Sequence, residues 1–288
     1  MSRIATGLPL YDEAACRTAC AVIDTYSTSF SLATRLLGPR TRRHVRHVYA
    51  LVRIADEIVD GPADEAGVDL DERHRVLDAL EQETEDAVTR GFSANLVVHA
   101  YARTARECGI GDELTGPFFE SMRTDLTTAS HDAESHAAYV YGSAEVVGLM
   151  CLAVFVNAGT SAPARPSGHL VAGARSLGRA FQDVNFLRDL DDDATRLGRD
   201  YLAIADATDR AAVLDRIDAD LARAAAVIPE LPADCRRAVT AAHDLFAALA
   251  QRPRGAAPGT GRISVPTAQK ARLAARAWLG AAPLGARG

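Results

Sequence analysis

Arg53-Ile-Ala-Asp56-Glu-Ile-Val-Asp60 sets two aspartates four residues apart within an apolar stretch. On an α-helix, residues four apart lie on the same face. Continuing back along that face leads to Tyr49, so Tyr49, Arg53, Asp56 and Asp60 form one narrow polar stripe. Valine, isoleucine, leucine and alanine cover most of the remaining surface of this helix. Such a stripe is typical of a polar seam inside a helical bundle, since a solvated face is usually wider.

A second stripe of the same kind occurs in Gln182-Asp-Val-Asn185-Phe-Leu-Arg188-Asp189-Leu-Asp-Asp-Asp193. Gln182, Asn185, Asp189 and Asp193 follow one another at helical spacings of three, four and four residues. Leucine, phenylalanine, valine and alanine fill the other side, and Arg188 lies beside the stripe. The chain therefore carries two helices with paired carboxylates on otherwise apolar surfaces.

Paired carboxylates on apolar helices need a compensating charge. Like charges one helical turn apart destabilise an exposed helix by roughly 0.2–0.5 kcal/mol, and by more when they are desolvated. Carboxylate and amide oxygens are hard ligands, so stripes without His or Cys favour Mg²⁺ over zinc. Two facing stripes would hold ions that neutralise a diphosphate and help it to leave. From the pattern alone, two ordinary solvated aspartate pairs remain the alternative interpretation.

The rest of the chain predicts an all-α protein of one domain. Alanine, leucine, arginine and glutamate dominate, and alternating β patterns are scarce. Breaks rich in Gly, Pro or Ser at 61–67, 109–111, 157–168 and 253–261 separate long helical stretches. Examples of these stretches are 42–59, 72–89, 136–156, 170–193 and 211–227. We predict an N-terminal segment and first helix over 1–24, one domain over 25–280 and a flexible tail over 281–288.

Composition and charge narrow the functional classes. The chain of 288 residues has a net charge of −6 and no basic stretch as dense as a nucleic-acid footprint. Its five cysteines form no zinc-type set with histidines, and we expect reduced thiols. Residues 1–15 do not resemble a secretory signal, and the apolar run 146–156 is shorter than the ~20 residues that span a bilayer. These features predict a cytoplasmic protein.

Several motifs, in order from about Thr25 to Trp278, resemble those of the squalene and phytoene synthase family. Residues 53–60 and 182–193 are similar to the family's two aspartate-rich motifs. Tyr26-Ser27-Thr28-Ser29-Phe30 resembles its Ser-x-Ser-Phe segment, and residues 139–150 resemble its Tyr-rich central helix. Residues 197–201 and 262–266 resemble its segments after the second motif and near the C-terminus. Within this family the chain is most similar to actinobacterial phytoene synthases.

The resemblance implies a fold and a set of site residues. The fold is a single-domain, all-α isoprenoid-synthase bundle with a central apolar cavity. Mg²⁺, or Mn²⁺ in its place, would be coordinated directly or through water by Asp56, Asp60, Asn185, Asp189 and Asp193. Diphosphate oxygens or the metal shell would be contacted by Ser27, Thr28, Ser29, Tyr49, Arg53, Gln182 and Arg188. The four aspartates would be catalytic, together with Tyr141 or Tyr139, which would steer a proton or stabilise a cation.

The implied reaction is the Mg-dependent, head-to-head condensation of two geranylgeranyl diphosphates to phytoene through prephytoene diphosphate, a step of carotenoid biosynthesis. It needs no NADPH, whereas a squalene-forming relative would need a nicotinamide. The same chemistry on farnesyl diphosphate, giving dehydrosqualene or squalene, stays open because the sequence does not show the depth of the cavity. A terpene cyclase that uses one diphosphate and a non-catalytic family member are further alternatives. Because the substrate and product are long hydrocarbons, a peripheral contact with the inner face of the membrane is also expected.

A few positions depart from the family's pattern. Glu145 stands where a small residue is common, Phe246 where a tyrosine is common, and Arg46 where an aromatic residue is frequent. These departures concern chain length and product more than metal binding. Without the resemblance, Ser27 and Ser29 would be interpreted as caps of a helix that begins near residue 30.

Overall fold

The computed structural model describes residues 6–128, 133–192, 207–252 and 265–285, and within these ranges every regular element is a helix. The five predicted helical stretches are confirmed as far as they are described, and the all-α prediction holds with them. The helices are α1 (Leu8–Tyr26), α2 (Thr28–Arg35), α3 (Pro39–Val59), α4 (Pro62–Glu65), α5 (Leu70–Arg90), α6 (Leu96–Cys108), α7 (Asp112–Thr127), α8 (Ala133–Val140), the π-helical turn η1 (Tyr141–Glu145), α9 (Val146–Asn157), α10 (Gly168–Asp192), α11 (Ala207–Val227), the 3₁₀ turn η3 (Ile228–Glu230), α12 (Ala233–Ala250) and α13 (Thr267–Trp278).

Short polar side chains and glycines set several helix ends. The side chains of Asp69 and Asn95 accept hydrogen bonds from backbone N–H groups in the first turns of α5 and α6. Gly91 and Gly109 end the same two helices with left-handed backbone, at φ angles of 84° and 71°. One predicted loop, residues 61–67, contains the single turn α4. Its Pro62 stands at the first helical position, where a missing N–H costs nothing.

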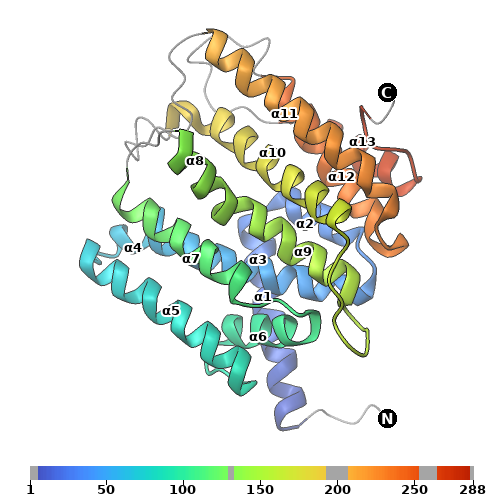
Figure 1. Cartoon of the computed structure of the whole chain (residues 1–288). Helices are drawn as coiled ribbons and strands as arrows, with labels where there is room; N and C mark the ends of the chain where they lie inside the picture. The colour runs from blue at the N-terminus through green and yellow to red at the C-terminus, as the bar shows by residue number, and fades with distance from the viewer. Residues whose placement is uncertain (1–5, 129–132, 193–206, 253–264, 286–288) are drawn as a thin grey trace.

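The helices form one row and a second group that packs behind it. Figure 1 shows α5, α7, the continuous rod of α8, η1 and α9, then α10 and α11 as successive neighbours. Behind this row, α1, α3 and α6 pack against one another, and α3 also packs against α7 and α9. α12 joins α10 and α11 to α2 and α13. The rod of α8, η1 and α9 therefore packs against both the helix of the first stripe, α3, and the helix of the second stripe, α10.

Glycines let the central rod approach its neighbours closely. A Cβ atom added to Gly178 in α10 would lie 2.6 Å from the carbonyl oxygen of Ala144. One added to Gly148 in α9 would lie 2.8 Å from the carbonyl oxygen of Ala174. Both positions exclude larger residues because the neighbouring atoms belong to backbone that cannot move aside. These contacts set the spacing between α10 and the rod.

The stretch Glu134–Asn157 is the one helix in the described part of the chain that is long and apolar enough to cross a membrane, by length and composition alone. The sequence-based estimate considered only 146–156, and the continuous helix is longer because η1 joins α8 to α9. More than half of its most apolar 18-residue window is buried inside the bundle, and Val146, Met150 and Val154 are buried. It therefore has the burial pattern of a core helix.

The two predicted boundaries of the domain fall in packed segments. The boundary at residues 24 and 25 lies inside α1, whose Ala15, Ala19 and Ile23 are buried against the bundle. In the predicted tail, the backbone N–H of Leu284 donates to Asp244 Oδ1 at 2.7 Å. Both ends of the described chain are thus attached to the same core.

A buried histidine pair joins α3 to α6. The hydroxyl of Thr104 lies 2.9 Å from His44 Nδ1 and 2.8 Å from His47 Nδ1. Arg43 Nε donates to His44 Nε2 at 3.0 Å. His44 is therefore neutral with its proton on Nδ1, and the Thr104 hydroxyl donates to His47. Burial lowers the pKa of His44 to about 4 and that of His47 to about 3.

We expect acid to destabilise the protein through these histidines. Between pH 6.5 and about 4 the unfolded chain binds protons that the folded protein does not, so the free energy of unfolding falls as pH falls. Each histidine contributes about 1.4 kcal/mol per pH unit in this window. Urea unfolding at several pH values should show that His47→Gln flattens this slope, whereas the exposed control His169→Gln leaves it unchanged. An unaltered slope in His47→Gln would contradict the assignment.

Candidate active site

The first stripe occupies the C-terminal end of α3. Asp56 retains about a quarter of its side-chain exposure, at 27%, and Asp60 is the half-buried residue that ends the helix. Burial raises the pKa of Asp56 well above its usual range, and the nearby charges of Asp60 and Asp125 raise it further. This end of α3 therefore holds acidic groups whose charges repel one another.

Arg53 neutralises this charge only in part. Its guanidinium forms an ion pair with Glu57 and lies 3.9 Å from Asp56 Oδ2. Its Cζ also stands 4.5 Å from the centre of the Tyr26 ring, in a cation–π contact. Tyr49, Arg53, Asp56 and Asp60 are all half-buried, so the stripe on α3 is neither fully enclosed nor a freely solvated face.

Asp125 of α7 joins this acidic group, and sequence reasoning missed it. Its side chain is buried, and Tyr139 donates a hydrogen bond to Asp125 Oδ2 at 2.9 Å. Ser121, one turn before Asp125, donates to the carbonyl oxygen of Tyr139 at 3.0 Å. The available signal was a single acid on the buried face that Phe118 and Met122 also form. A lone aspartate on an apolar helix face is a candidate for buried chemistry.

Tyr139, more than Tyr141, connects the first stripe to the helix of the second. Its ring is buried and lies 6.2 Å from the ring of Phe186 in α10. Tyr141 is half-buried instead, with Arg175 Cζ 5.1 Å from its ring centre. Of the two tyrosines that the sequence left open, Tyr139 is therefore the one that touches the acidic group.

An aromatic cluster from four helices connects the starts of the two stripes. The Phe30 ring of α2 lies 6.2 Å from Tyr49 of α3 and 6.3 Å from Phe181 of α10. Phe246 of α12 stacks on Phe181 at 3.7 Å and lies 5.9 Å from Phe30. Tyr49 begins the first stripe and Phe181 directly precedes Gln182, which begins the second. The two stripes therefore start at the same apolar wall.

Ser27, in the Ser-x-Ser-Phe segment, both caps α2 and lies beside Tyr49. Its hydroxyl accepts a hydrogen bond from Phe30 N at 3.1 Å, so the capping interpretation is confirmed for this residue. Burial raises the pKa of the Tyr49 phenol, and the charge of Arg53 and the Ser27 side chain beside it oppose that shift. Ser27 thus joins the start of α2 to the first stripe. The side chains of Thr28 and Ser29 lie outside the described part of the structure.

The second stripe is described in part. Gln182 and Asn185 are half-buried on α10, and Arg188, beside them, is half-buried too. The backbone of Asp189 belongs to α10, but its side chain and the whole of Asp193 lie outside the described residues. Asp183, next to Gln182, is buried and binds Arg216 of α11 at 2.9 Å. That aspartate therefore serves the contact between α10 and α11.

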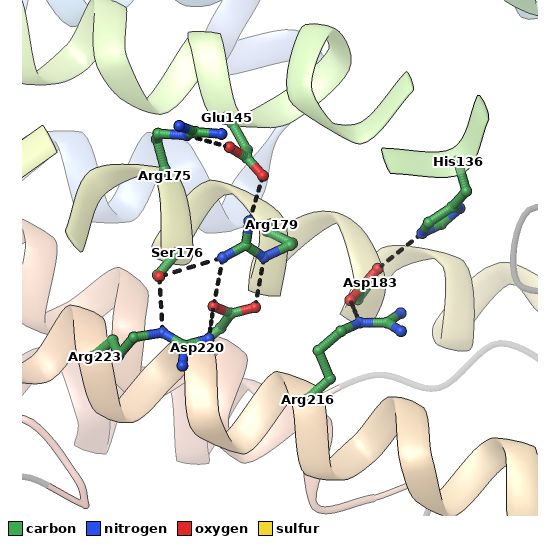
Figure 2. A network of polar contacts seen from close by, with 9 residues as sticks. All are labelled: His136, Glu145, Arg175, Ser176, Arg179, Asp183, Arg216, Asp220 and Arg223. Atoms are coloured by element: carbon green, nitrogen blue, oxygen red, sulfur yellow. Dashed lines mark hydrogen bonds and ion pairs between the residues drawn. The ribbon is translucent and has the colours of Figure 1, made fainter. Parts of the chain in front are cut away.

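Figure 2 shows a second polar network between η1, α10 and α11, built around the unusual Glu145. Arg175 Nε and Arg179 Nη1 each donate to the Glu145 carboxylate at 2.6 Å. Arg179 also forms a two-pronged bond to Asp220, at 2.7 and 2.8 Å. Burial by itself would raise the pKa of Asp220, but the hydrogen bonds from Arg179 and Arg223 outweigh it and lower that pKa.

The donors of the first stripe suit a hard divalent cation. A carboxylate with a raised pKa and only a distant ion-pair partner, as Asp56 has, gains most from a bound cation. Within the described ranges, no three His, Cys, Asp or Glu side chains converge on one metal position. The predicted cluster draws on Asp189 and Asp193 for its other carboxylates, so it stays a prediction.

Within the described residues the protein is a bundle of helices alone, with a polar stripe on α3, another on α10 and an aromatic cluster where both stripes begin. The chain belongs to the squalene/phytoene synthase family, whose model matches residues 23–213. The resemblance that the motifs predicted is therefore confirmed.

Relatives with assigned names include plant and bacterial synthases. Phytoene synthase 3 of Zea mays is 33% identical over 179 residues, which cover 62% of this chain and 40% of the plant protein. The 4,4'-diapophytoene synthase of Staphylococcus haemolyticus is 26% identical over 204 residues, 69% of this chain and 66% of that protein. The chain thus matches about two fifths of the length of the maize relative.

Solved structures of similar fold include a dehydrosqualene synthase in complex with ligand, with a TM-score of 0.75, 22% identity and coverage of 92% of this chain and 96% of that one. Squalene synthase HpnC from Alicyclobacillus acidocaldarius gives a TM-score of 0.69 at 20% identity, with coverage of 85% and 95%. These likenesses confirm the predicted fold class.

Proposed function

We propose that this protein condenses two geranylgeranyl diphosphates head to head and forms phytoene through prephytoene diphosphate. The observation that carries the proposal is the pair of polar stripes, on α3 and α10, that begin at one aromatic wall. Family membership supports the reaction class. The names of the matched plant relatives support the C20 substrate, because they are phytoene synthases.

The residues of this chain have distinct tasks in that reaction. Asp56, Asp60, Asn185, Asp189 and Asp193 would hold Mg²⁺, which when bound neutralises the leaving diphosphate. Arg53 and Arg188 would bind diphosphate oxygens, since a guanidinium matches their geometry. The aromatic wall of Phe30, Phe181 and Phe246 excludes water from carbocations and offers them π faces.

The bonds and charges balance without a redox partner. Loss of diphosphate from the first molecule gives an allylic cation, which the C2–C3 double bond of the second molecule attacks. Loss of one proton closes the cyclopropane of prephytoene diphosphate. A second loss of diphosphate, rearrangement and loss of another proton give phytoene, so no NADPH enters. A hydride would be needed only for a squalene-type product.

Product analysis tests the proposal. Purified protein is incubated with Mg²⁺ and geranylgeranyl or farnesyl diphosphate, separately and as an equimolar mixture, with and without NADPH. A C40 hydrocarbon that forms without NADPH and predominates in the mixture is the expected result. A predominant C30 product would keep the mechanism but replace the substrate. Consumption of neither diphosphate would overturn the catalytic proposal and favour a non-catalytic family member.

Tyr139 and Tyr141 should differ in their effect on turnover. Tyr139→Phe removes the hydrogen bond to the buried Asp125 carboxyl group, and a bond to a charged group is worth about 1.5–3 kcal/mol, so we expect about a tenfold or larger loss of kcat. Tyr141→Phe should change kcat by less than about threefold, because the packing of its ring on Arg175 remains. Steady-state kinetics with parallel thermal melts separate a catalytic effect from unfolding. The reverse order of effects would restore Tyr141 as the catalytic candidate.

A further inference from the structure

The charge of the chain is divided unevenly between its two ends. After Asp244 the remaining 44 residues contain no Asp or Glu, although the whole chain has a net charge of −6. The same segment contains seven basic residues, so residues 1–244 carry −13 (−6 minus +7). The basic residues are Arg252, Arg254, Arg262, Lys270, Arg272, Arg276 and Arg287. Such asymmetry indicates a polyanionic partner for the basic end.

Helix α13, in this basic segment, also exposes an apolar face. Its Leu273 and Ala277 are buried against the bundle. The opposite side presents Ala271, Ala275 and Trp278, which follow at helical spacings, and then Leu279. Trp278 is 59% exposed and Leu279 is 75% exposed, the highest value among the exposed large hydrophobic residues of the described chain. α13 is therefore apolar on the side that faces away from the protein.

Basic side chains flank this apolar face. Arg272 is exposed beside it, and Lys270 and Arg276 are half-buried at its border. Arg237 of α12 stands 6.0 Å from the Trp278 ring centre. Leu284, 39% exposed, continues the apolar surface past the helix. Its backbone N–H donates to Asp244, so this end is held against the core.

We propose that α13 with Trp278, Leu279 and Leu284 docks the protein onto the surface of an anionic lipid bilayer. Tryptophan and leucine enter the boundary between headgroups and acyl chains, and basic side chains beside them bind anionic headgroups. Nucleic acid would use the charges but not the exposed Trp–Leu face. These observations on α13 do not depend on the proposed reaction. Either proposal can therefore fail while the other holds.

The position of α13 relates the docking surface to the candidate site. α13 packs on α12 and α2. α2 contributes Phe30 and α12 contributes Phe246 to the aromatic wall. Docking through α13 would place these two helices nearest the bilayer, on the side from which a long-chain lipid substrate arrives.

Intrinsic fluorescence tests the docking of α13 directly, because Trp278 is the only tryptophan of the chain. The wild-type protein is titrated with vesicles of phosphatidylcholine alone and with 30% phosphatidylglycerol. With the anionic vesicles we expect a blue shift of the emission and quenching by brominated acyl chains, both weakened at high salt. Binding without any change in the emission would overturn the proposal, because another surface would then be docking. Failure to bind at either composition would overturn it as well.

Paired variants separate the apolar from the electrostatic contribution to vesicle binding, which is measured by co-sedimentation. Trp278→Ala with Leu279→Ala should lower partitioning by more than about tenfold through lost apolar burial. Lys270→Gln with Arg272→Gln should lower it by about tenfold to thirtyfold on anionic vesicles only. Matched controls are Leu8→Ser with Leu10→Ser, which are exposed at the other end of the chain, and Arg75→Gln on α5. If the controls weaken binding as much as the α13 variants, or if Trp278 and Leu279 contribute nothing, the surface is misassigned.

Discussion

Asp56→Asn should lower the turnover of the prenyl diphosphate by about a hundredfold to a thousandfold, the usual effect of removing one electrostatic stabiliser of a leaving group. The same variant should melt at a higher temperature than the wild type in the absence of metal. Burial and the charges of Asp60 and Asp125 disfavour the Asp56 carboxylate in the folded protein, and a neutral amide removes that repulsion. Opposite changes in activity and stability mark a residue retained for function.

Kinetics and melting in EDTA and in excess Mg²⁺ measure both effects. The control is Asp86→Asn on the exposed side of α5, which makes the same chemical change away from the stripes. Asp189→Asn should resemble Asp56→Asn in activity, and the double variant should lose little more than either single one if both stripes act on one diphosphate. Full activity in Asp56→Asn would refute its role in the site.

Arg179→Ala should destabilise the fold more than any other single change in the network of Figure 2. Arg179 binds both Glu145 and Asp220, whose side chains are 4% and 0% exposed. Removing one partner from a buried ion pair costs about 3–5 kcal/mol when the remaining charge is left unpaired. Glu145 keeps Arg175 and Asp220 keeps Arg223, so the cost should lie near the lower end of that range. For a chain of this order of size, each kcal/mol lowers the melting temperature by about 2–4 °C. We therefore expect a fall on the order of 10 °C.

Neighbouring variants identify the cause of that fall. Arg175→Ala should cost far less, since Arg175 is 45% exposed and Glu145 keeps its bond to Arg179. Glu145→Ala combined with Arg179→Ala should be less destabilised than the sum of the single changes, because both single changes remove the same Arg179–Glu145 contact. A melting temperature of Arg179→Ala equal to that of the wild type would show that the network contributes nothing to stability.

Much of the fold was predictable because it depends on local periodicity. The apolar repeat around Asp56 and the break at Gly109 act over one or two helical turns, and the helices formed where these signals stand. η1 was not predictable, because this single π turn inside a longer helix has no capping side chain of its own to mark it. Its presence joins α8 to α9 into one helix.

The candidate site was predictable to the extent that it consists of residues on one helix. Asp56 and Asp60 share a stripe by spacing alone, and the same holds for Gln182 and Asn185. The choice between Tyr139 and Tyr141 could not be made in this way, since it depends on which tyrosine faces α7. Asp125 was missed for the same reason, because one acid on one helix has no spacing partner.

The sequence by itself determined the helices, the two polar stripes and the family, because these depend on composition, on the spacing of nearby residues and on the order of the motifs. Only the tertiary structure decided which partners meet: Tyr139 with Asp125, Glu145 with Arg179, and Phe30 with the helices of both stripes. It also decided that α13 turns Trp278 and Leu279 outward. These contacts depend on how each helix is rotated and how closely it approaches its neighbours. Glycine contacts and buried ion pairs between distant residues set that geometry, and a periodic pattern does not encode it.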